Sequence, residues 1–348
     1  MARRIFAVLL SASLAVWCGI ENHARAADFY AGKTIDFVVG TDAGGGFDTY
    51  ARAIARHLAR FLPGTPVVVV RNMPGAGSAK AAAYLYSLAP KDGTTIAALF
   101  PGVIMDPLLQ KRGGGQFDAA KFIYLGSADS DPRLCFTGPS SKIKTFEQAM
   151  AQRTVMGATQ PGASTSDYAY MHKNAAGAKF EVVSGYKGSA DIFLAIERGE
   201  AEGACGVDWS SLRTQRPTWL ADKTVNLLVQ DATDPDPDLQ ALEVPNVESF
   251  VKDDKDKRAV ALIVSQQIFS RPYAAPPGVP AEQAALLRQA FAAVLHDQQF
   301  LADAEAAHLN IKPSSAERVQ EAVAKLYAAP PDVVERAREL VAASDTRK

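Results

Sequence analysis

The sequence has few of the features that mark nucleic-acid-binding or repeat proteins. Its formal net charge is -1, and no cluster of Lys or Arg offers a surface for phosphate groups. Glycine and proline are spread along the chain, so no segment is of low complexity, and no repeat has a fixed period. These absences exclude a nucleic-acid partner and a repeat architecture. They leave a globular protein long enough for two domains of ordinary size.

Motifs of common enzyme classes are also missing. The sequence contains neither the G-x-S-x-G motif of hydrolases nor the H-E-x-x-H motif of metalloproteases. Gly32-Lys33-Thr34 resembles the end of a P-loop, but the first glycine is absent and the segment precedes its strand. His57, His172, His296 and His308 are scattered over predicted helices without metal-ligand spacing. We therefore predict a protein that is not an enzyme and has no metal or cofactor.

The longest apolar run is too short to cross a membrane comfortably. It extends from Ile5 to Ile20, whereas a span needs about 20 residues. Arg3-Arg4 precedes it, and Ala24-Arg25-Ala26 provides the small residues of a cleavage site. This pattern predicts a signal peptide cleaved after Ala26 and a periplasmic protein. A membrane anchor is the alternative.

Cysteine is scarce: two cysteines, Cys135 and Cys205, follow the predicted signal peptide. Both lie in short apolar stretches that we interpret as strands of one lobe. An oxidising compartment allows such a pair to form a disulfide. The sequence leaves open whether the two are joined or are buried free thiols.

The first part of the mature chain alternates strands and helices. The pattern predicts strands at Thr34–Val39, Pro66–Arg71 and Thr94–Leu99, with helices at Phe47–Leu62 and Ser78–Leu88 between them. The unbroken valines of the second strand predict burial on both faces, as in a parallel sheet. The expected product is an α/β layer with right-handed crossovers.

A second region begins near Ile123. Its predicted strands are 123–126, 134–137, 154–157, 180–184, 203–207 and 225–230, and its predicted helices are 145–152, 166–175 and 190–198. The acidic turn Asp234–Asp238 is interpreted as a solvated loop rather than a cation site. The chain then passes through Arg271–Pro277, a proline-rich segment that suggests a return between lobes. Helices at 280–297, 316–328 and 331–343 end the chain.

This order predicts a two-lobed α/β protein. Residues 27–130 form the first part of lobe one, residues 131–268 form lobe two, and residues 269–348 return to lobe one. A cleft between the lobes is the expected place for a ligand.

Three glycine-rich loops each join a strand to a helix. We name them the first loop (Thr41–Gly46), the second loop (Gly157–Ser164) and the third loop (Gly185–Ser189). The first N–H groups of a helix lack partners and carry partial positive charge, so such loops bind anions. In parallel sheets they lie at the carboxyl ends of the strands, where ligands bind. Glycine in a tight turn is the alternative explanation for each loop taken singly.

Polar side chains in and near these loops are candidates for contacts with a small acid. Hydroxyl groups can donate to carboxylate oxygens, although the same residues are expected as helix N-caps. Asp42 would repel an acid, so it faces solvent or contacts an amine or hydroxyl on the ligand. The candidate ligand-binding residues are Thr41, Asp42, Gly44, Gly45, Gly46, Asp48, Thr159, Gly162, Ser164, Thr165, Tyr186, Lys187, Gly188, Ser189 and Asp208.

Several segments together resemble one family. The segments are Ala43–Arg52, Val68–Gly77, Pro90–Thr94, Gly185–Gly188, Glu197–Glu200 and Ala275–Pro280. They are similar to motifs of the Bug-type receptors, the periplasmic solute-binding proteins of tripartite tricarboxylate transporters. The resemblance spans essentially the whole mature chain.

The resemblance implies a monomeric two-lobed receptor with two crossing strands and a ligand between the lobes. Backbone N–H groups and water near the three loops would hold the carboxylates of an organic acid, and a membrane permease would receive it. The family often has an uncharged residue near Asp42, and the second loop also differs in detail, so a citrate receptor is not implied. A periplasmic hydrolase on this scaffold, or a sensor that feeds a signalling protein, remains an alternative.

Overall fold

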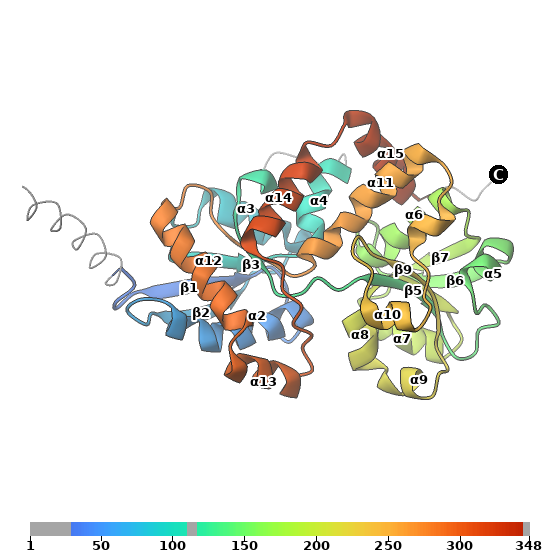
Figure 1. Cartoon of the computed structure of the whole chain (residues 1–348), viewed down its shortest axis with the longest axis horizontal. Helices are drawn as coiled ribbons and strands as arrows, with labels where there is room; N and C mark the ends of the chain where they lie inside the picture. Colours follow the sequence, from blue (N-terminus) through green and yellow to red (C-terminus); the bar gives the residue numbers. More distant parts are fainter. Residues whose placement is uncertain (1–28, 110–116, 344–348) are drawn as a thin grey trace, which may run out of the picture.

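The computed structural model describes residues 29–109 and 117–343. The predicted signal peptide and its cleavage site lie outside these residues. The described chain forms two five-stranded sheets, each flanked by helices, which lie side by side in Figure 1. The predicted α/β class and two-lobed architecture are confirmed. We call the part built on the first sheet lobe one and the part built on the second sheet lobe two.

The first sheet has the strand order β2-β1-β3-β10-β4. Strands β1, β2 and β3 are parallel, whereas β10 is antiparallel to both of its neighbours. The strands are β1 (Thr34–Val39), β2 (Val67–Asn72), β3 (Thr95–Ala98), β4 (Ile123–Ser127) and β10 (Pro272–Ala275). The sheet is therefore mixed, and its fourth strand comes from the segment that we interpreted only as a return crossing.

The second sheet has the order β7-β6-β8-β5-β9. Strands β6, β7 and β8 are parallel, and β5 pairs antiparallel with β8 and β9. The strands are β5 (Arg133–Thr137), β6 (Thr154–Ala158), β7 (Phe180–Ser184), β8 (Gly203–Asp208) and β9 (Asn226–Asp231). Each of the predicted strands is present, with ends that differ by no more than one residue.

Helices cover both sheets. They are α2 (Gly46–Leu58), α3 (Ala79–Ser87), α4 (Gly102–Leu109), α5 (Phe146–Ala151), α6 (Ser164–Ala176), α7 (Ser189–Glu197), α8 (Trp209–Gln215), α9 (Pro217–Ala221), α10 (Pro237–Ala241), α11 (Asp254–Val264), α12 (Ala281–Leu295), α13 (Gln298–Ala306), α14 (Ala316–Tyr327) and α15 (Pro331–Val341). Short 3₁₀ segments are Ala59–Phe61, Ala76–Ser78, Ala119–Lys121, Val247–Phe250 and Ser265–Phe269.

The prediction of two helices after α12 is wrong, because a further helix, α13, begins after only two intervening residues. Asp297 separates them: its carboxylate accepts a hydrogen bond from the N–H of Phe300 and so caps a new helix. We had interpreted Asp297 as the last residue of the preceding helix. The aspartate is an N-cap, which is the more common position for this residue type.

The chain passes between the sheets more than once. Residues 128–132 lead from β4 to β5, and residues 270–271 lead back into β10. After α14, which packs against β4, the chain crosses again, because α15 packs against α6 and α11 as well as α4 (Figure 1). The end of the chain therefore differs from the expectation that all of residues 269–348 pack in lobe one. The apolar face of α15 is covered by helices of both lobes.

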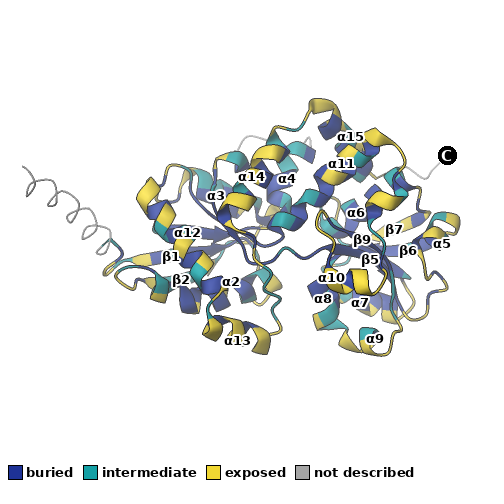
Figure 2. Ribbon diagram, in the orientation of Figure 1, coloured by how far each residue is buried: buried dark blue, intermediate teal, exposed yellow. Residues whose placement is uncertain are grey.

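A continuous apolar core joins the two halves. One buried cluster contains Val38 and Ala97 of the first sheet together with Met156 and Val229 of the second. Figure 2 shows the inner strands of both sheets as mostly buried, whereas the edge strands β2 and β7 and the outer helix faces are largely intermediate or exposed. The halves are thus packed together through helices such as α15, and a ligand site between them must lie where the contacts are polar.

The expectation that β2 is buried on both faces is wrong. Strand β2 is an edge strand, and Val67 is 62% exposed. Its valines pair with β1 on one side only, so a run of β-branched residues here reports strand propensity rather than burial.

Among the described residues, no helix combines the length and apolar character needed to cross a membrane.

Candidate functional site

The three glycine-rich loops lie where parallel strands end and helices begin. The first loop follows β1, the second follows β6 and the third follows β7. The N-cap residues of α2, α6 and α7 are Gly45, Ala163 and Gly188, and none makes a side-chain capping bond. The N-caps of α3, α8, α9, α12 and α15 also make no such bond, whereas Thr, Asp or Ser side chains cap α5, α10, α11, α13 and α14. The three loop helices therefore present N-terminal N–H groups that no capping side chain occupies.

Each loop is held by an aspartate in the first turn of the helix that follows it. Asp48 accepts a hydrogen bond from the N–H of Gly44 (2.8 Å), and Asp167 accepts one from Gly162 (3.0 Å). In the third loop, Asp191 accepts a hydrogen bond from the N–H of Lys187 at 3.3 Å. This shared arrangement fixes the loop backbone. Sequence analysis missed Asp167 and Asp191, although their placement in the first helical turn repeats that of Asp48.

Asp48 is a loop-fixing residue, and its carboxylate has no room for a ligand. It is 3% exposed, and its two oxygens also accept hydrogen bonds from Arg52 (2.9 Å) and Asn72 (2.9 Å). Burial alone would raise the pKa of Asp48, but the hydrogen bonds from Arg52, Gly44 and Asn72 outweigh burial and lower the pKa. We therefore assign Asp48 to fixing the backbone of the first loop rather than to direct contact with a ligand.

We expect Asp48→Ala to lower the free energy of unfolding by about 2 kcal/mol at pH 7, because several charge-assisted hydrogen bonds are lost. The lowered pKa means that Asp48 stabilises the fold above its unfolded pKa and that this contribution disappears as the pH falls through the folded pKa. The difference between wild type and variant in urea denaturation should therefore shrink in acid. Asp42→Ala in the same loop is the control, since Asp42 is exposed, and it should change stability by less than about 0.5 kcal/mol. Equal effects of the two substitutions would contradict this role for Asp48.

The second loop is fixed by two threonines. The Thr159 N–H donates to the Thr165 hydroxyl (3.0 Å), and the two hydroxyl oxygens lie 2.8 Å apart. These hydroxyls bind one another, and neither caps α6, because the N-cap of α6 is Ala163 and makes no side-chain bond. Burial raises the pKa of Asp167 to about 7, and nearby Asp106 adds to the rise. The negative charge in the first turn of α6 is thus reduced near neutral pH, which favours an anion there.

The third loop lies beside the second because β6 and β7 are neighbours. The N–H of Gly185 donates to the carbonyl oxygens of Ala158 and Thr159, so the two loops share hydrogen bonds. The Ser189 hydroxyl accepts a hydrogen bond from Gln215 at 3.1 Å. Lys187 is exposed, and Tyr186 packs partly against the apolar core of lobe two. The backbone of this loop, rather than its side chains, is therefore its main binding group.

The edges of the two lobes approach one another at the loops. A β-carbon placed on Gly102, the first residue of α4 in lobe one, would lie 4.0 Å from the carbonyl oxygen of Gly162 in the second loop. A β-carbon on Gly46 in the first loop would lie 3.8 Å from the guanidinium of Arg271. The second loop therefore approaches the start of α4 in lobe one, and the first loop lies beside Arg271. The segment before α4, Leu99–Gly102, also belongs to this region and was missed by sequence analysis.

Two buried arginines lie between the loops, and sequence analysis did not select either. Arg133 and Arg271 are 6% and 8% exposed. Asp208 lies between them: its carboxylate oxygens are 3.3 Å from Arg133 and 3.8 Å from Arg271. Arg133 follows one crossing segment and Arg271 precedes β10, so both arginines come from the places where the chain changes lobes. Predicted residue Asp208 therefore lies at the centre of an ionic cluster between the lobes.

Several buried polar atoms near this cluster have no hydrogen-bond partner within the described chain. They include Nε of Arg133, Nε of Arg271, Nε1 of Trp209 and the hydroxyl of Ser166. All four are donors, and buried donors without partners are rare in folded proteins. Their concentration here indicates a region that water or an anion completes.

The acidic turn Asp234–Asp238 is exposed at four of its five positions, as expected of a solvated loop, but Asp236 is buried. Asp236 is 6% exposed and forms an ion pair with Lys312 at 2.7 Å, and Asp234 pairs with Arg318. Both cations come from the C-terminal part of the chain. The turn therefore forms a polar contact between the lobes. Its partners come from a distant part of the chain, so the local sequence pattern could not show them.

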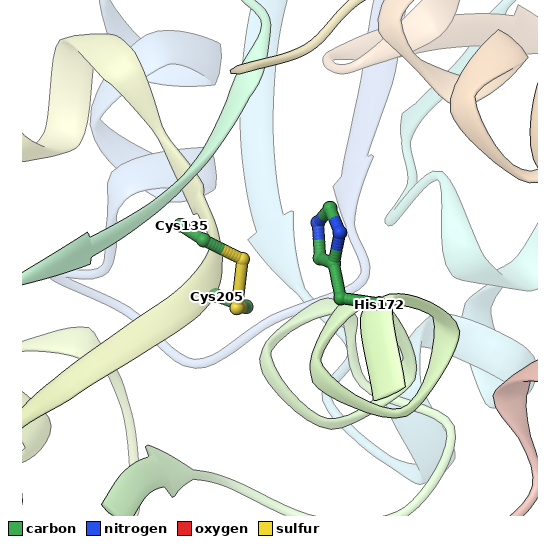
Figure 3. A group of neighbouring side chains, drawn as sticks. All are labelled: Cys135, His172 and Cys205. Atoms are coloured by element: carbon green, nitrogen blue, oxygen red, sulfur yellow. A yellow bond between two sulfur atoms is a disulfide. The ribbon is translucent and has the colours of Figure 1, made fainter. Parts of the chain in front are cut away.

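Cys135 and Cys205 are joined by a disulfide that cross-links neighbouring strands β5 and β8. Figure 3 shows His172 beside the bond, and the sulfur and ring nitrogen atoms lie within 4.8 Å of one another. Because the sulfurs are bonded to each other, they are not available as thiolate ligands for a metal.

His172 is fully buried and pairs with Asp231 at 2.9 Å. It makes no hydrogen bond to a loop serine in the described structure, so the arrangement that a hydrolase needs is not formed.

Comparisons with known proteins agree with the geometry. No family model matches the chain. One curated relative, the UPF0065 protein in the TAR-I ttuE-ttuC' intergenic region of Agrobacterium vitis, is 27% identical over 215 residues, which cover 59% of this chain. The match spans 58% of that relative's length.

Solved structures match over most of the chain. A TctC solute-binding protein from Polaromonas has a TM-score of 0.66 at 18% identity and covers 88% of this chain and 99% of its own. The periplasmic binding protein BugD has a TM-score of 0.62 at 19% identity, with 89% and 98% covered. The resemblance to the Bug-type receptors is confirmed. MatC from Rhodopseudomonas palustris with bound malate has a TM-score of 0.62 at 17% identity, with 89% and 99% covered. These neighbours with the Bug-type fold are solute-binding or periplasmic binding proteins rather than enzymes.

Proposed function

We propose that this protein is a periplasmic receptor that binds a small organic acid between its lobes and delivers it to the permease of a tripartite transporter. The observation that carries the proposal is the position of three uncapped helix N-termini, each after a glycine-rich loop that follows a parallel strand, with one in lobe one and two in lobe two. Each attracts an anion by about 0.3–1 kcal/mol, and more when partly buried. Together they suit a ligand with negative charge at one or both ends.

The polar contacts between lobes support binding by closure. Arg213 of α8 donates to Asn310 (3.2 Å), and Lys312 pairs with Asp236 (2.7 Å), so lobe two contacts residues 310–312 of lobe one through side chains rather than a packed apolar surface. These polar contacts can separate while the apolar core that joins the halves, including α15, stays packed. A ligand that touches both lobes favours the state in which they meet.

Two further observations support the location and the ligand class. The first 26 residues have the pattern of a signal peptide, and the similar BugD is a periplasmic binding protein. The similar MatC structure contains malate, a small dicarboxylate. Both agree with a periplasmic receptor for a carboxylate.

A substitution at the helix N-caps tests the proposal. We expect Gly45→Asp and Gly188→Asp each to weaken binding of the organic acid at least tenfold, because the new carboxylate would bind the free N–H groups and repel the ligand. Both glycines have extended backbone angles, and the nearest heavy atom to an added β-carbon is 3.6 Å away at Gly45, with none within 4 Å at Gly188. Stability should therefore be unchanged or slightly increased. Isothermal titration against a panel of organic acids, sugars and amino acids gives the affinity, and thermal unfolding gives the stability.

Gly45→Ala and Gly188→Ala are the matched controls, since alanine adds neither charge nor a capping group. They should retain most of the affinity. Binding of sugars but of no acid by the wild type would contradict the carboxylate receptor. Aspartate variants that bind the acid as tightly as the alanine variants would show that these helix ends do not hold it.

A further inference from the structure

An aromatic pair marks the edge of lobe one beside the first loop. The rings of Phe47 and Phe100 meet edge to face, with centroids 4.4 Å apart. Phe47 lies in the first turn of α2, and Phe100 follows β3 in the segment that leads to α4. Both therefore lie at the carboxyl ends of the parallel strands of the first sheet. This is the edge at which the first loop presents its N–H groups.

Phe100 is presented outward rather than packed into a core. It is 36% exposed, whereas most phenylalanines of the described chain are buried. Its backbone is fixed, because its N–H donates to the hydroxyl of Ser78, which also binds the carbonyl oxygen of Gly40 at the end of β1. The Phe100 ring is therefore fixed through its backbone and exposed at the edge where we propose that the ligand binds. It offers an apolar surface for contact with the ligand.

The Phe47 ring, in contrast, is held by a contact with a charged side chain. The guanidinium of Arg271 lies 4.5 Å from the centroid of the Phe47 ring and 4.6 Å from that of Tyr50. Arg271 in turn lies 3.8 Å from Asp208 of lobe two. Phe47 thus contacts both Phe100 and the ionic cluster between the lobes. The exposed Phe100 ring therefore lies one side chain away from that cluster and a few ångströms from the start of α2.

The second loop lies close to the same segment. The β-carbon position of Gly102, two residues after Phe100, is 4.0 Å from the carbonyl oxygen of Gly162. A ligand carboxylate bound at the first turn of α2 would therefore have its body between Phe100 and lobe two. A hydroxyl-rich acid would gain little from an exposed phenyl ring, whereas an aromatic body would gain edge or face contacts.

We propose that the ligand is an aryl carboxylate, with its carboxylate at the N-terminus of α2 and its ring against Phe100. This inference rests on the proposed function and specifies the class of acid. Ring-to-ring contact adds to the burial of apolar surface, so an aryl acid should bind more tightly than an aliphatic hydroxy acid of similar size.

Titration calorimetry with benzoate and malate as probes tests the inference. We expect the wild type to bind benzoate at least tenfold more tightly than malate. Phe100→Ala should reduce this preference about tenfold, because it removes the ring contact and leaves the first loop in place. Phe100→Tyr should keep the preference, and Phe100→Leu should retain only part of it. Circular dichroism and thermal unfolding of each variant verify that it is folded.

The possible failures are distinguishable. Binding of malate more tightly than benzoate, or an unchanged preference in Phe100→Ala, overturns the aryl ligand but leaves the carboxylate receptor. Binding of neither acid, nor of any other acid in a wider panel, overturns the proposed function and this inference with it.

Discussion

Gly206→Ala is expected to lower the free energy of unfolding by about 3 kcal/mol and to weaken ligand binding more than tenfold. Gly206 lies in β8 with a φ of 66°, a left-handed conformation that costs other residues about 1–2 kcal/mol. A β-carbon there would also overlap the carbonyl oxygen of Ser164, the first residue of α6. Overpacking of this kind costs about 1–3 kcal/mol. Because Ser164 begins the helix that follows the second loop, the collision should displace the N–H groups that we assign to the ligand.

Gly177→Ala is the matched control for this substitution. Gly177 also has a left-handed φ, 76°, and ends α6, but an added β-carbon would have no heavy atom within 4 Å. It should cost about 1 kcal/mol and leave the affinity unchanged. Urea denaturation and titration calorimetry of both variants separate backbone strain from displacement of α6. If Gly206→Ala behaved as Gly177→Ala does, the close packing of β8 against the second loop would not matter for binding.

The strands and the three loops could be predicted because their signals are local. An apolar run such as Thr34–Val39 followed by a glycine-rich segment and an amphipathic helix needs no distant partner to be recognised. The glycine-rich segments indicated where these helices begin, but the side-chain caps expected from residues such as Ser164 and Thr165 are absent, because the N-caps are Gly45, Ala163 and Gly188. The sequence therefore indicated the ligand edge before the relative placement of the lobes was known.

The ionic cluster between the lobes could not be predicted in this way. Arg133 and Arg271 are 138 residues apart, and each would ordinarily be interpreted as a charged residue that flanks an apolar strand. Only the mixed sheet order brings them to either side of Asp208. The burial of Asp236 within the exposed acidic turn could not be predicted for the same reason, because its partner Lys312 comes from the last part of the chain. Contacts between lobes depend on topology, which short windows of sequence do not contain.

The position of α15 is a related example. Its periodicity predicted an amphipathic helix, and the helix is present. Periodicity shows that one face must be buried but not what covers it. In the structure α6 and α11 cover part of that face, so α15 links the lobes.

Removal of the disulfide is the second large effect that we expect. The bond joins residues that are 70 positions apart in the sequence. By the chain-entropy relation, a cross-link that closes a loop of this length stabilises the fold by about 4 kcal/mol, mainly by restricting the unfolded chain. The double variant Cys135→Ala, Cys205→Ala should therefore unfold at a temperature roughly 6 °C below the wild type. Strands β5 and β8 remain paired by backbone hydrogen bonds, so the folded state itself should persist.

A reductant distinguishes this explanation from a packing defect. If the bond is the source of stability, a dithiol reductant under partly denaturing conditions should lower the midpoint of the wild type most of the way to that of the double variant and leave the double variant unchanged. Alanine at these fully buried positions also removes apolar contacts, and that part of the loss is insensitive to reductant. A wild-type midpoint that stays well above that of the double variant after complete reduction would assign the stabilisation to packing of the cysteine side chains rather than to the cross-link. Mass spectrometry of alkylated thiols verifies that the bond was opened in the sample measured.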